Sequence, residues 1–372
     1  MSAPDTDAIL YESPIHGQGR ELGAALAAAH AVADHPFFRE IARFAPLRPL
    51  LEGGVGDPHA AMDALVGLGE GCANGAMLLS FGAHAFAVAA AIARFAPPAM
   101  RDAVLPGLAS GQMIGAFAAT EAGAGSDVMA METRYAETRT GYVLHGQKAW
   151  ITNAATADLF VVFATKDTRL HSRGISAFLV ERGTPGLATA AVTEPGHAAS
   201  TLGTVTLADV HVPREALIGR INGGGMVFRN SIAQERILLS AFLVGSIRRA
   251  LMRSVDHAAT RQQYGVPIGA NQYVAGRIVD TYRRYATTRL LLRFGIERLA
   301  SGTATEADAS LVKLQCSEAA AESALDAFRL HGAGGYESAN RDGLLDTLSS
   351  VTYSGTSDLQ KVIIAAALGL TA

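Results

Sequence analysis

The sequence has few cysteines, few charged residues and few aromatic side chains. Its 372 residues include two cysteines, Cys72 and Cys316, too few for a disulfide framework or a cysteine-based metal cluster, so no metal site is predicted. Charged residues make up 17% of the chain and the formal net charge is -3. Because this balance does not attract nucleic acid or an anionic membrane surface, neither partner is expected.

Hydrophobic residues, in contrast, make up 49% of the chain. A surface with so few charges suggests apolar interfaces, which predicts a homo-oligomer, either a dimer or a tetramer. The alternative explanation for the low charge is simply an alanine-rich composition. The N-terminal segment lacks the pattern of a signal peptide. The longest apolar stretch, AHAFAVAAAIARFAPPAM, is broken by Arg94 and Pro97, which favours a buried helix over a membrane span. A cytoplasmic location is therefore expected.

Local patterns divide the chain into three parts and predict an α+β fold. Residues 1–114 show helical spacing of apolar residues, with a break at Pro97 and Pro98. Residues 115–222 contain short β-type runs separated by turn residues. Residues 223–372 return to long apolar stripes, which predict helices over 226–261, 271–302, 305–332 and 356–370. The expected architecture is an N-terminal helical domain, a middle β-barrel-like domain and a C-terminal four-helix bundle.

Five segments carry the informative motifs. In chain order they are AFAATEAGAGSDVMAM, GYVLHGQKAWITNA, RQQYGVPIGANQ, RLHGAGGY and YSGTSDLQK. Together they resemble the acyl-CoA dehydrogenase family over nearly all the chain beyond about residue 50. The chain departs from the family pattern at Tyr264, Arg329 and Ala333, where a Phe, a Gln and a Gly are usual, and the segment before residue 50 matches poorly.

The resemblance implies FAD as the cofactor and an acyl thioester as the substrate. It places Phe117, Ala119 and Thr120 around the flavin ring, where threonine hydroxyls can donate to ring acceptors. The full set that it implies for FAD is Phe117, Ala119, Thr120, Gly125, Ser126, Trp150, Thr152, Arg261, Tyr264, Gln272, Arg329, Gly332, Thr356 and Asp358. It implies that Arg261 and Gln272 reach the dinucleotide of a neighbouring subunit, and that Gly123 and Gly125 allow close backbone approach to an anionic group. For the substrate it implies Ser126, Arg236, Ser354 and Gly355.

The usual catalytic base of the family is missing from its expected place. The family reaction removes an α-proton with a carboxylate while a β-hydride passes to flavin N5. Most members carry that carboxylate just before Gly-Thr in the closing motif, where this chain has Ser354. In some branches the base lies on a C-terminal helix before an arginine, and Glu235 precedes Arg236. We therefore predict Glu235 as the base; a surface glutamate near a helix start is the alternative, and Asp358 and Glu337 are weaker candidates.

The predicted function is FAD-dependent α,β-dehydrogenation of an acyl thioester on CoA or on a carrier protein. The electron acceptor is expected to be an electron-transfer flavoprotein or O₂. A flavin oxidase or monooxygenase on the same fold, and a non-catalytic flavin- or thioester-binding protein, are the alternatives. On this basis Glu235→Gln should keep FAD but abolish bleaching of the flavin by substrate, and Ser354→Ala should do little.

Overall fold

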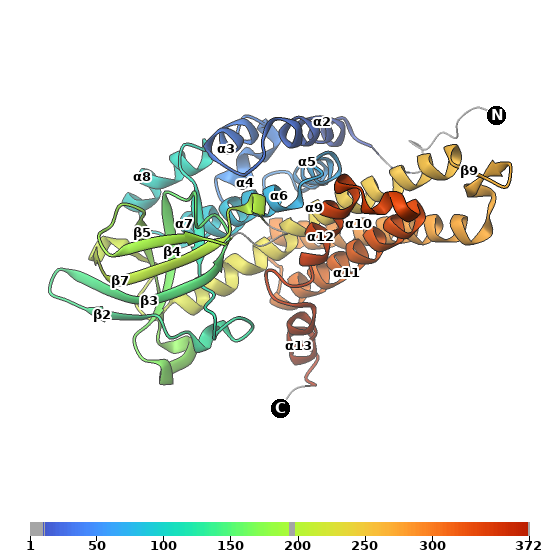
Figure 1. Ribbon diagram of the computed structural model, residues 1–372. Coiled ribbons are helices and arrows are strands. Elements are labelled where there is room, and N and C mark those ends of the chain that lie inside the picture. The colour runs from blue at the N-terminus through green and yellow to red at the C-terminus, as the bar shows by residue number, and fades with distance from the viewer. Residues whose placement is uncertain (1–9, 11, 193–197, 371–372) are drawn as a thin grey trace.

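The computed structural model describes residues 10, 12–192 and 198–370, and runs from helices to a sheet and back to helices (Figure 1). The fold class predicted from the sequence is therefore confirmed. The N-terminal helices are α2 (Pro14–Ala29), α3 (His35–Ile41), α4 (Arg48–Leu51), α5 (Pro58–Gly71), α6 (Gly75–Gly82), α7 (Ala90–Phe95) and α8 (Pro98–Ala109). Side-chain caps begin several of them: Asp57 accepts from the His59 N–H at α5, and Asn74 accepts from the Met77 N–H at α6.

The longest apolar stretch forms one continuous helix. The π-helix η2 (Ala83–Ala89) joins α6 to α7 without a break. Within the described residues, Gly75–Phe95 is long and apolar enough to cross a membrane, but 94% of its most apolar window is buried inside the protein. The predicted buried helix is therefore confirmed, and Pro97 and Pro98 separate it from α8 as expected.

The middle of the chain forms a sheet that is eight-stranded within the described residues. Its strands are β1 (Gly115–Ala118), β2 (Arg134–Glu137), β3 (Gly141–Ile151), β4 (Leu159–Thr165), β5 (Ile175–Glu181), β6 (Leu187–Ala191), β7 (Gly203–Pro213) and β8 (Leu217–Ile218). The order is β6-β7-β3-β2-β4-β5-β8, with β1 added parallel to β4. The β3–β7 register shifts between Lys148 and Ile151. Such a bulge turns a side chain out of the ladder, and the residue that it frees is Trp150.

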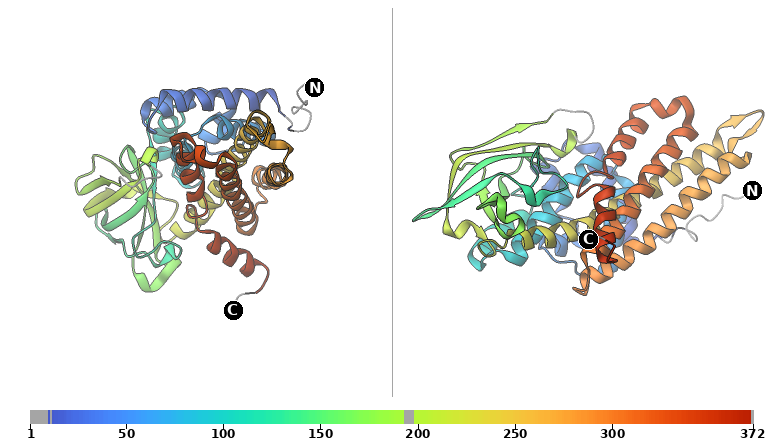
Figure 2. Two further views of the ribbon diagram at one scale, coloured as in Figure 1. Left: turned by 45° about the vertical axis from the view of Figure 1, so that its right-hand side comes forward. Right: turned by 90° about the horizontal axis from the view of Figure 1, so that it is seen from below.

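Long helices return after the sheet and lie side by side (Figures 1 and 2). They are α9 (Gly224–Thr260), α10 (Gln272–Ala300) and α11 (Glu306–His331), followed by α12 (Ser338–Ser349) and α13 (Ser357–Ala367). Thr305 and Asp308 form a capping box at the start of α11, and Gly332 ends it with φ 58°. The sequence predicted this helix over 305–332, but it did not predict α12, whose apolar stripe is weak. Helix α13 packs against α11, and its C-terminal end projects from the body of the molecule (Figure 1).

Glycines let α9 pack closely against the N-terminal helices. A Cβ on Gly69 of α5 would lie 2.3 Å from the Phe242 carbonyl oxygen of α9, and a Cβ on Gly245 of α9 would lie 2.2 Å from the Val66 carbonyl oxygen of α5. Neither distance is possible for a real side chain, so any larger residue at these positions would push the helices apart. The tight contact fixes α9, which carries Glu235, relative to the N-terminal helices.

Candidate active site

A pocket of about 1480 Å³, its open mouth included, lies where the sheet meets α9 and the turn before α13. The predicted site residues that line it are Phe117, Ala119, Thr120, Gly125, Ser126, Trp150, Thr152, Glu235, Arg236, Ser354, Gly355 and Thr356. The fold therefore brings together three of the five motifs and the helix that carries the predicted base.

A buried ion pair that the sequence analysis did not single out supports one wall of the pocket. Lys148 is 0% exposed, and its Nζ lies 2.8 Å from Glu121 Oε1 and donates to the Ala119 carbonyl at 3.0 Å. Glu121 also accepts hydrogen bonds from two backbone N–H groups just before β2. Thr120 lies between the two tethered residues, so the pair fixes the backbone that presents Thr120 to the pocket. The sequence signal that could have revealed Lys148 as buried is the period-two pattern of β3, which points alternate residues inward.

The corner of the chain that carries Trp150 and Thr152 is held in place by hydrogen bonds from Asn153. Trp150 has φ 58° and a side chain that is 58% exposed. Asn153 follows with φ 68° and is buried; its Nδ2 donates to the Ser80 and Gly115 carbonyls, both at 3.0 Å. Left-handed backbone at non-glycine residues is held by such surrounding contacts. Asn153 thus ties the corner to α6 and to the start of β1.

His84, which the sequence analysis also missed, holds the start of β1 through hydrogen bonds to backbone groups. Its Nδ1 accepts from the Gly115 N–H and its Nε2 donates to the Leu108 carbonyl, both at 3.1 Å. Complete burial lowers the pKa of His84 to about 4, so the ring is neutral, as this donor and acceptor arrangement requires.

Glu235 lies on α9 with its carboxyl group in the pocket wall, 6% exposed. Its Oε2 accepts a hydrogen bond from Ser354 Oγ at 2.9 Å. Burial raises the pKa of Glu235 to about 7, against the lowering effects of the Ser354 hydroxyl and the Arg236 charge. A carboxylate with a pKa near neutrality can both accept and release a proton at physiological pH. The reading of Glu235 as a surface glutamate is therefore wrong.

The turn that carries Ser354 is held in an unusual backbone conformation. Ser354 has φ 51° and Gly355 has φ 94°. Arg236 Nε donates to the Ser354 carbonyl at 2.9 Å, and Gln360 Nε2 donates to the Gly355 carbonyl at 2.9 Å. The φ of Gly355 favours glycine, and a Cβ there would lie 2.7 Å from Gln360 Nε2 and would displace that side chain from its hydrogen bond.

Several predicted cofactor residues do not reach this pocket within one chain. Arg261, Tyr264 and Gln272 lie around the hairpin of β9 (Gln262–Gln263) and β10 (Val266–Pro267), at the far end of the long helices (Figure 1). Arg329 and Gly332 lie at the end of α11, where His331 stacks on His257 at a ring distance of 4.3 Å. Burial, His331 and Arg261 all lower the pKa of His257. Arg261 and its hairpin therefore lie at the same end of the helices as Arg329 and Gly332.

Two residues of the closing motif have roles at the start of α13. The Thr356 hydroxyl lines the pocket but also accepts from the Leu359 N–H at 3.2 Å, which makes it the N-cap. The Asp358 side chain is 91% exposed and pairs with Lys361 at 3.2 Å. Asp358 is thus outside the pocket, neither a contact for its contents nor a candidate base within this chain.

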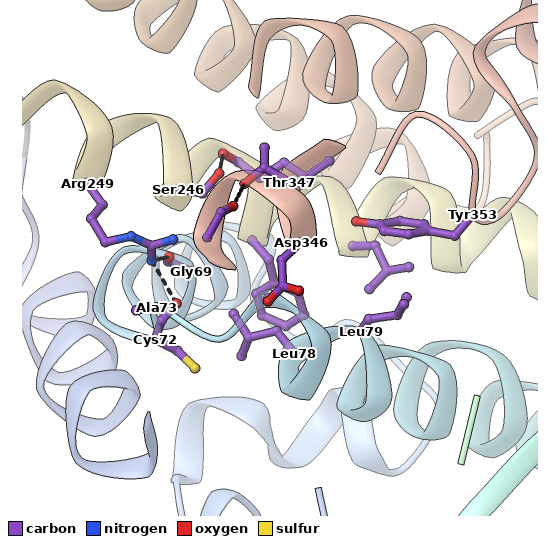
Figure 3. A pocket seen from close by; sticks show the side chains of 15 residues that line it. Gly69, Cys72, Ala73, Leu78, Leu79, Ser246, Arg249, Asp346, Thr347 and Tyr353 are labelled. Atoms are coloured by element: carbon purple, nitrogen blue, oxygen red, sulfur yellow. Dashed lines mark hydrogen bonds between the residues drawn. The ribbon is translucent and has the colours of Figure 1, made fainter. Parts of the chain in front are cut away.

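A smaller cavity of about 420 Å³ lies behind the pocket, between α5, α6, α9 and α12 (Figure 3). Leu79 and Tyr353 line both spaces and form the wall between them. The far side is polar, because Arg249 Nη1 donates to the Gly69 and Cys72 carbonyls at 2.6 and 2.7 Å. Arg249 thereby caps the C-terminal end of α5.

The lining of the larger pocket fits a flavin dinucleotide. Phe117 and Trp150 offer apolar surface to a planar ring. Within the described part of the chain, the Thr120 and Thr152 hydroxyls have no hydrogen-bond partner in the protein, so both are available to ring acceptors. A Cβ on Gly125 would meet nothing within 4 Å. The protein's own packing does not require glycine there, and the space beside it is open to a ligand.

Family models match most of the chain. The description "Acyl-CoA dehydrogenase, middle domain" applies to residues 116–210, and "Acyl-CoA dehydrogenase, C-terminal domain" to residues 222–369. The chain belongs to the acyl-CoA dehydrogenase family. It is therefore an FAD-dependent oxidoreductase that dehydrogenates an acyl thioester.

Two curated relatives in this family differ in the acyl carrier that their names state. An L-prolyl-[peptidyl-carrier protein] dehydrogenase of Serratia sp. is 37% identical over 82% of this chain and 79% of its own length. The isovaleryl-CoA dehydrogenase of Solanum tuberosum is 33% identical over 78% of this chain and 72% of its own length.

Solved structures of acyl-CoA dehydrogenase relatives align over almost the whole chain. "PigA with FAD and proline" has a TM-score of 0.89 and 29% identity, covering 100% of this chain and 99% of its own. The prolyl acyl carrier protein oxidase AnaB has a TM-score of 0.90 and 29% identity, covering 96% of this chain and 100% of its own. The N-terminal segment that matches the family poorly in sequence is thus covered by these structural alignments.

Proposed function

We propose that this enzyme oxidises a small acyl group of the prolyl type, carried as a thioester on a carrier protein, with Glu235 as the catalytic base. The observation that carries the choice of base is the buried Glu235 carboxyl group in the pocket wall, with its pKa raised to about 7. The names of the Serratia, PigA and AnaB relatives support the choice of substrate.

Each pocket residue has a defined task in this proposal. FAD, when bound along Phe117, Thr120 and Trp150, supplies the acceptor for the β-hydride. Glu235 removes the α-proton, and the apolar surroundings that raise its pKa bring it closer to that of the activated carbon. The Ser354 N–H has no acceptor among the described residues, so it is available to polarise the thioester carbonyl.

The size of the pocket supports a short acyl group. Leu79 and Tyr353 close the inner end, and the cavity beyond them is small and partly polar. A long alkyl chain would have to displace these side chains and then face Arg249, which is bonded to carbonyl groups. A compact ring or a short branched chain ends before this wall.

Leu79→Ala should shift the substrate range towards longer acyl chains. Removing the shared wall joins the two spaces, and each additional CH₂ that becomes buried contributes about 0.8 kcal/mol. For two added carbons the ratio of kcat/KM for the longer to the shorter substrate should rise about tenfold. Leu78→Ala is the matched control, because Leu78 lines only the inner cavity. Equal shifts in both variants would refute the wall function of Leu79.

The substrate proposal is tested by flavin bleaching without oxygen. A prolyl-loaded carrier protein, prolyl-pantetheine and isovaleryl-CoA are mixed separately with the FAD enzyme, and the flavin absorbance is followed. The expected order of rates is carrier protein first, pantetheine second and isovaleryl-CoA last. Faster bleaching by isovaleryl-CoA would reverse the assignment and make the enzyme an acyl-CoA dehydrogenase for a short branched chain.

The electron acceptor distinguishes a second candidate function. AnaB is described as an oxidase, which favours O₂ as an alternative to an electron-transfer flavoprotein. The rates at which air and such a flavoprotein reoxidise the reduced enzyme decide between the two.

We further propose a homo-oligomer, a dimer or tetramer, in the cytoplasm. Tyr264 is fully exposed and Tyr273 is 85% exposed, and apolar rings displayed at the end of a helix pair are typical of surfaces that another subunit covers. In this arrangement Arg261 and Gln272 would contribute to the FAD site of a neighbour, together with Arg329 and Gly332.

A further inference from the structure

Ser354 occupies the position that usually holds the family's base, and it is bonded to two consecutive residues of α9. Its Oγ donates to Glu235 Oε2 at 2.9 Å, and its carbonyl accepts from Arg236 Nε at 2.9 Å. A third contact comes from Gln360 Nε2, which lies 3.3 Å from the same carbonyl. Only the bond to Glu235 uses the serine side chain, because the other two end on the backbone carbonyl that any residue in this turn would offer.

We propose that Ser354 is a positioning residue whose hydroxyl fixes the carboxylate of Glu235 for proton removal. The proposal rests on the proposed function, because it presupposes that Glu235 is the base. Glu235 Oε2 is engaged by the hydroxyl, while Oε1 has no hydrogen-bond partner among the described residues. One oxygen is thus held and the other is left for the proton of the substrate.

The backbone of the turn contributes to this positioning. Ser354 has φ 51°, a conformation that costs a non-glycine residue about 1–3 kcal/mol and persists only when surrounding bonds impose it. Arg236 and Gln360 supply those bonds. Since α9 provides both Glu235 and Arg236, the same helix fixes the donor and the acceptor of the Ser354–Glu235 hydrogen bond.

The charged surroundings of Glu235 are sparse, so one hydrogen bond has a large effect. The titratable residues in the pocket lining are Glu235, Arg236 and Tyr353. Arg236 itself lies 3.7 Å from Glu306 and feels the charge of Lys313, both on α11. The pKa of Glu235 is raised by burial to about 7, and the Ser354 hydroxyl is the first of the groups that lower it. Loss of that hydroxyl must therefore raise the pKa further.

The sequence alone predicts little effect of Ser354→Ala, and the hydrogen bond changes that prediction. The rate of anaerobic flavin bleaching at saturating substrate should rise with pH, since the base acts deprotonated. A hydrogen bond to a charged group corresponds to about one pH unit or more. In Ser354→Ala the half-maximal point should move upward by about one pH unit. The limiting rate at high pH should also fall, because the carboxylate is no longer held, so the rate at pH 6 falls more than tenfold.

Ser354→Gly is the matched variant, because glycine accepts φ 51° without strain and also lacks the hydroxyl. Equal upward shifts in both variants, with FAD content unchanged, assign the effect to the hydroxyl. A profile that overlays the wild type, or a rate reduced equally at every pH, overturns the positioning role. If Glu235→Gln remains active, the base assignment itself fails, which this pair of variants separates from a failure of the Ser354 proposal alone.

Discussion

Glu235→Gln should bind FAD and substrate normally yet lose flavin bleaching by substrate about 10³-fold or more. General bases contribute about 10²–10⁴-fold to proton transfer, and the other titratable groups in the pocket lining, Arg236 and Tyr353, are poor replacements. Burial raises the pKa of Tyr353 well above its ordinary range, so its phenol stays protonated. The measurement is stopped-flow absorbance of the flavin without oxygen, with the spectral shift on substrate binding as proof that the complex forms.

Asp358→Asn is the control for this experiment. Asp358 is the other carboxylate near the closing motif, but its side chain is 91% exposed and paired with Lys361. It should bleach at the wild-type rate. A rescue variant follows from the same geometry: Glu235→Gln combined with Ser354→Glu returns a carboxylate to the place that most of the family uses, and part of the rate should come back. Wild-type activity in Glu235→Gln alone would exclude Glu235 as the base.

Glu235→Gln should also change the free energy of unfolding, by an amount that depends on pH. The folded-state pKa of Glu235 is about 7, above the ordinary value of 4.5, so folding favours the neutral form. Its stabilising contribution is complete below pH 4.5 and is lost as the pH rises through 7. Glu235→Gln should therefore gain stability relative to the wild type between pH 5 and pH 8, by about 2–3 kcal/mol, measured by urea unfolding.

The sequence predicted the pocket better than it predicted what holds the pocket together. Motif residues such as Thr120 and Trp150 could be named because their types suit a flavin. Asn153 and His84 act by clamping backbone groups, and that role depends on which carbonyl or N–H lies opposite in space. Neither composition nor spacing reveals such a partner when it is remote in the chain, as Gly115 is from both.

The same limit explains the predicted residues that lie outside the pocket. Arg261 and Gln272 come from motifs whose proposed role needs a second subunit, so one chain cannot bring them to its own flavin site. Asp358 belongs to the closing motif, but the first turn of α13 points its side chain to solvent. In Ser354 the sequence showed a missing carboxylate, whereas the structure shows a hydroxyl bonded to the carboxylate that we propose as its replacement.

Lys148→Met should weaken both folding and FAD binding, because it leaves the Glu121 carboxylate buried without its partner. Burial alone would raise the pKa of Glu121, but Lys148 and the neighbouring N–H groups overcome this and hold it below its ordinary value. Burial lowers the pKa of Lys148 to about 8, so both groups are charged at pH 7. Removing one member of a buried pair costs about 3–5 kcal/mol. Since Lys148 also tethers the Ala119 carbonyl, the backbone around Thr120 should loosen.

Trp150 provides a direct readout of this effect, since it is the one tryptophan of the chain and lines the pocket. Quenching of its fluorescence during FAD titration should give a dissociation constant at least tenfold higher in Lys148→Met, beside a lower urea midpoint. The double variant Glu121→Gln/Lys148→Met removes both charges and should recover much of the stability, because neutral replacement of a buried pair is often tolerated. FAD affinity should recover less, since the tether to Ala119 is still missing. Unchanged FAD affinity in Lys148→Met would show that the strand pairing of β1 with β4 and the Ala149 N–H bond to the Thr120 carbonyl hold Thr120 without the ion pair.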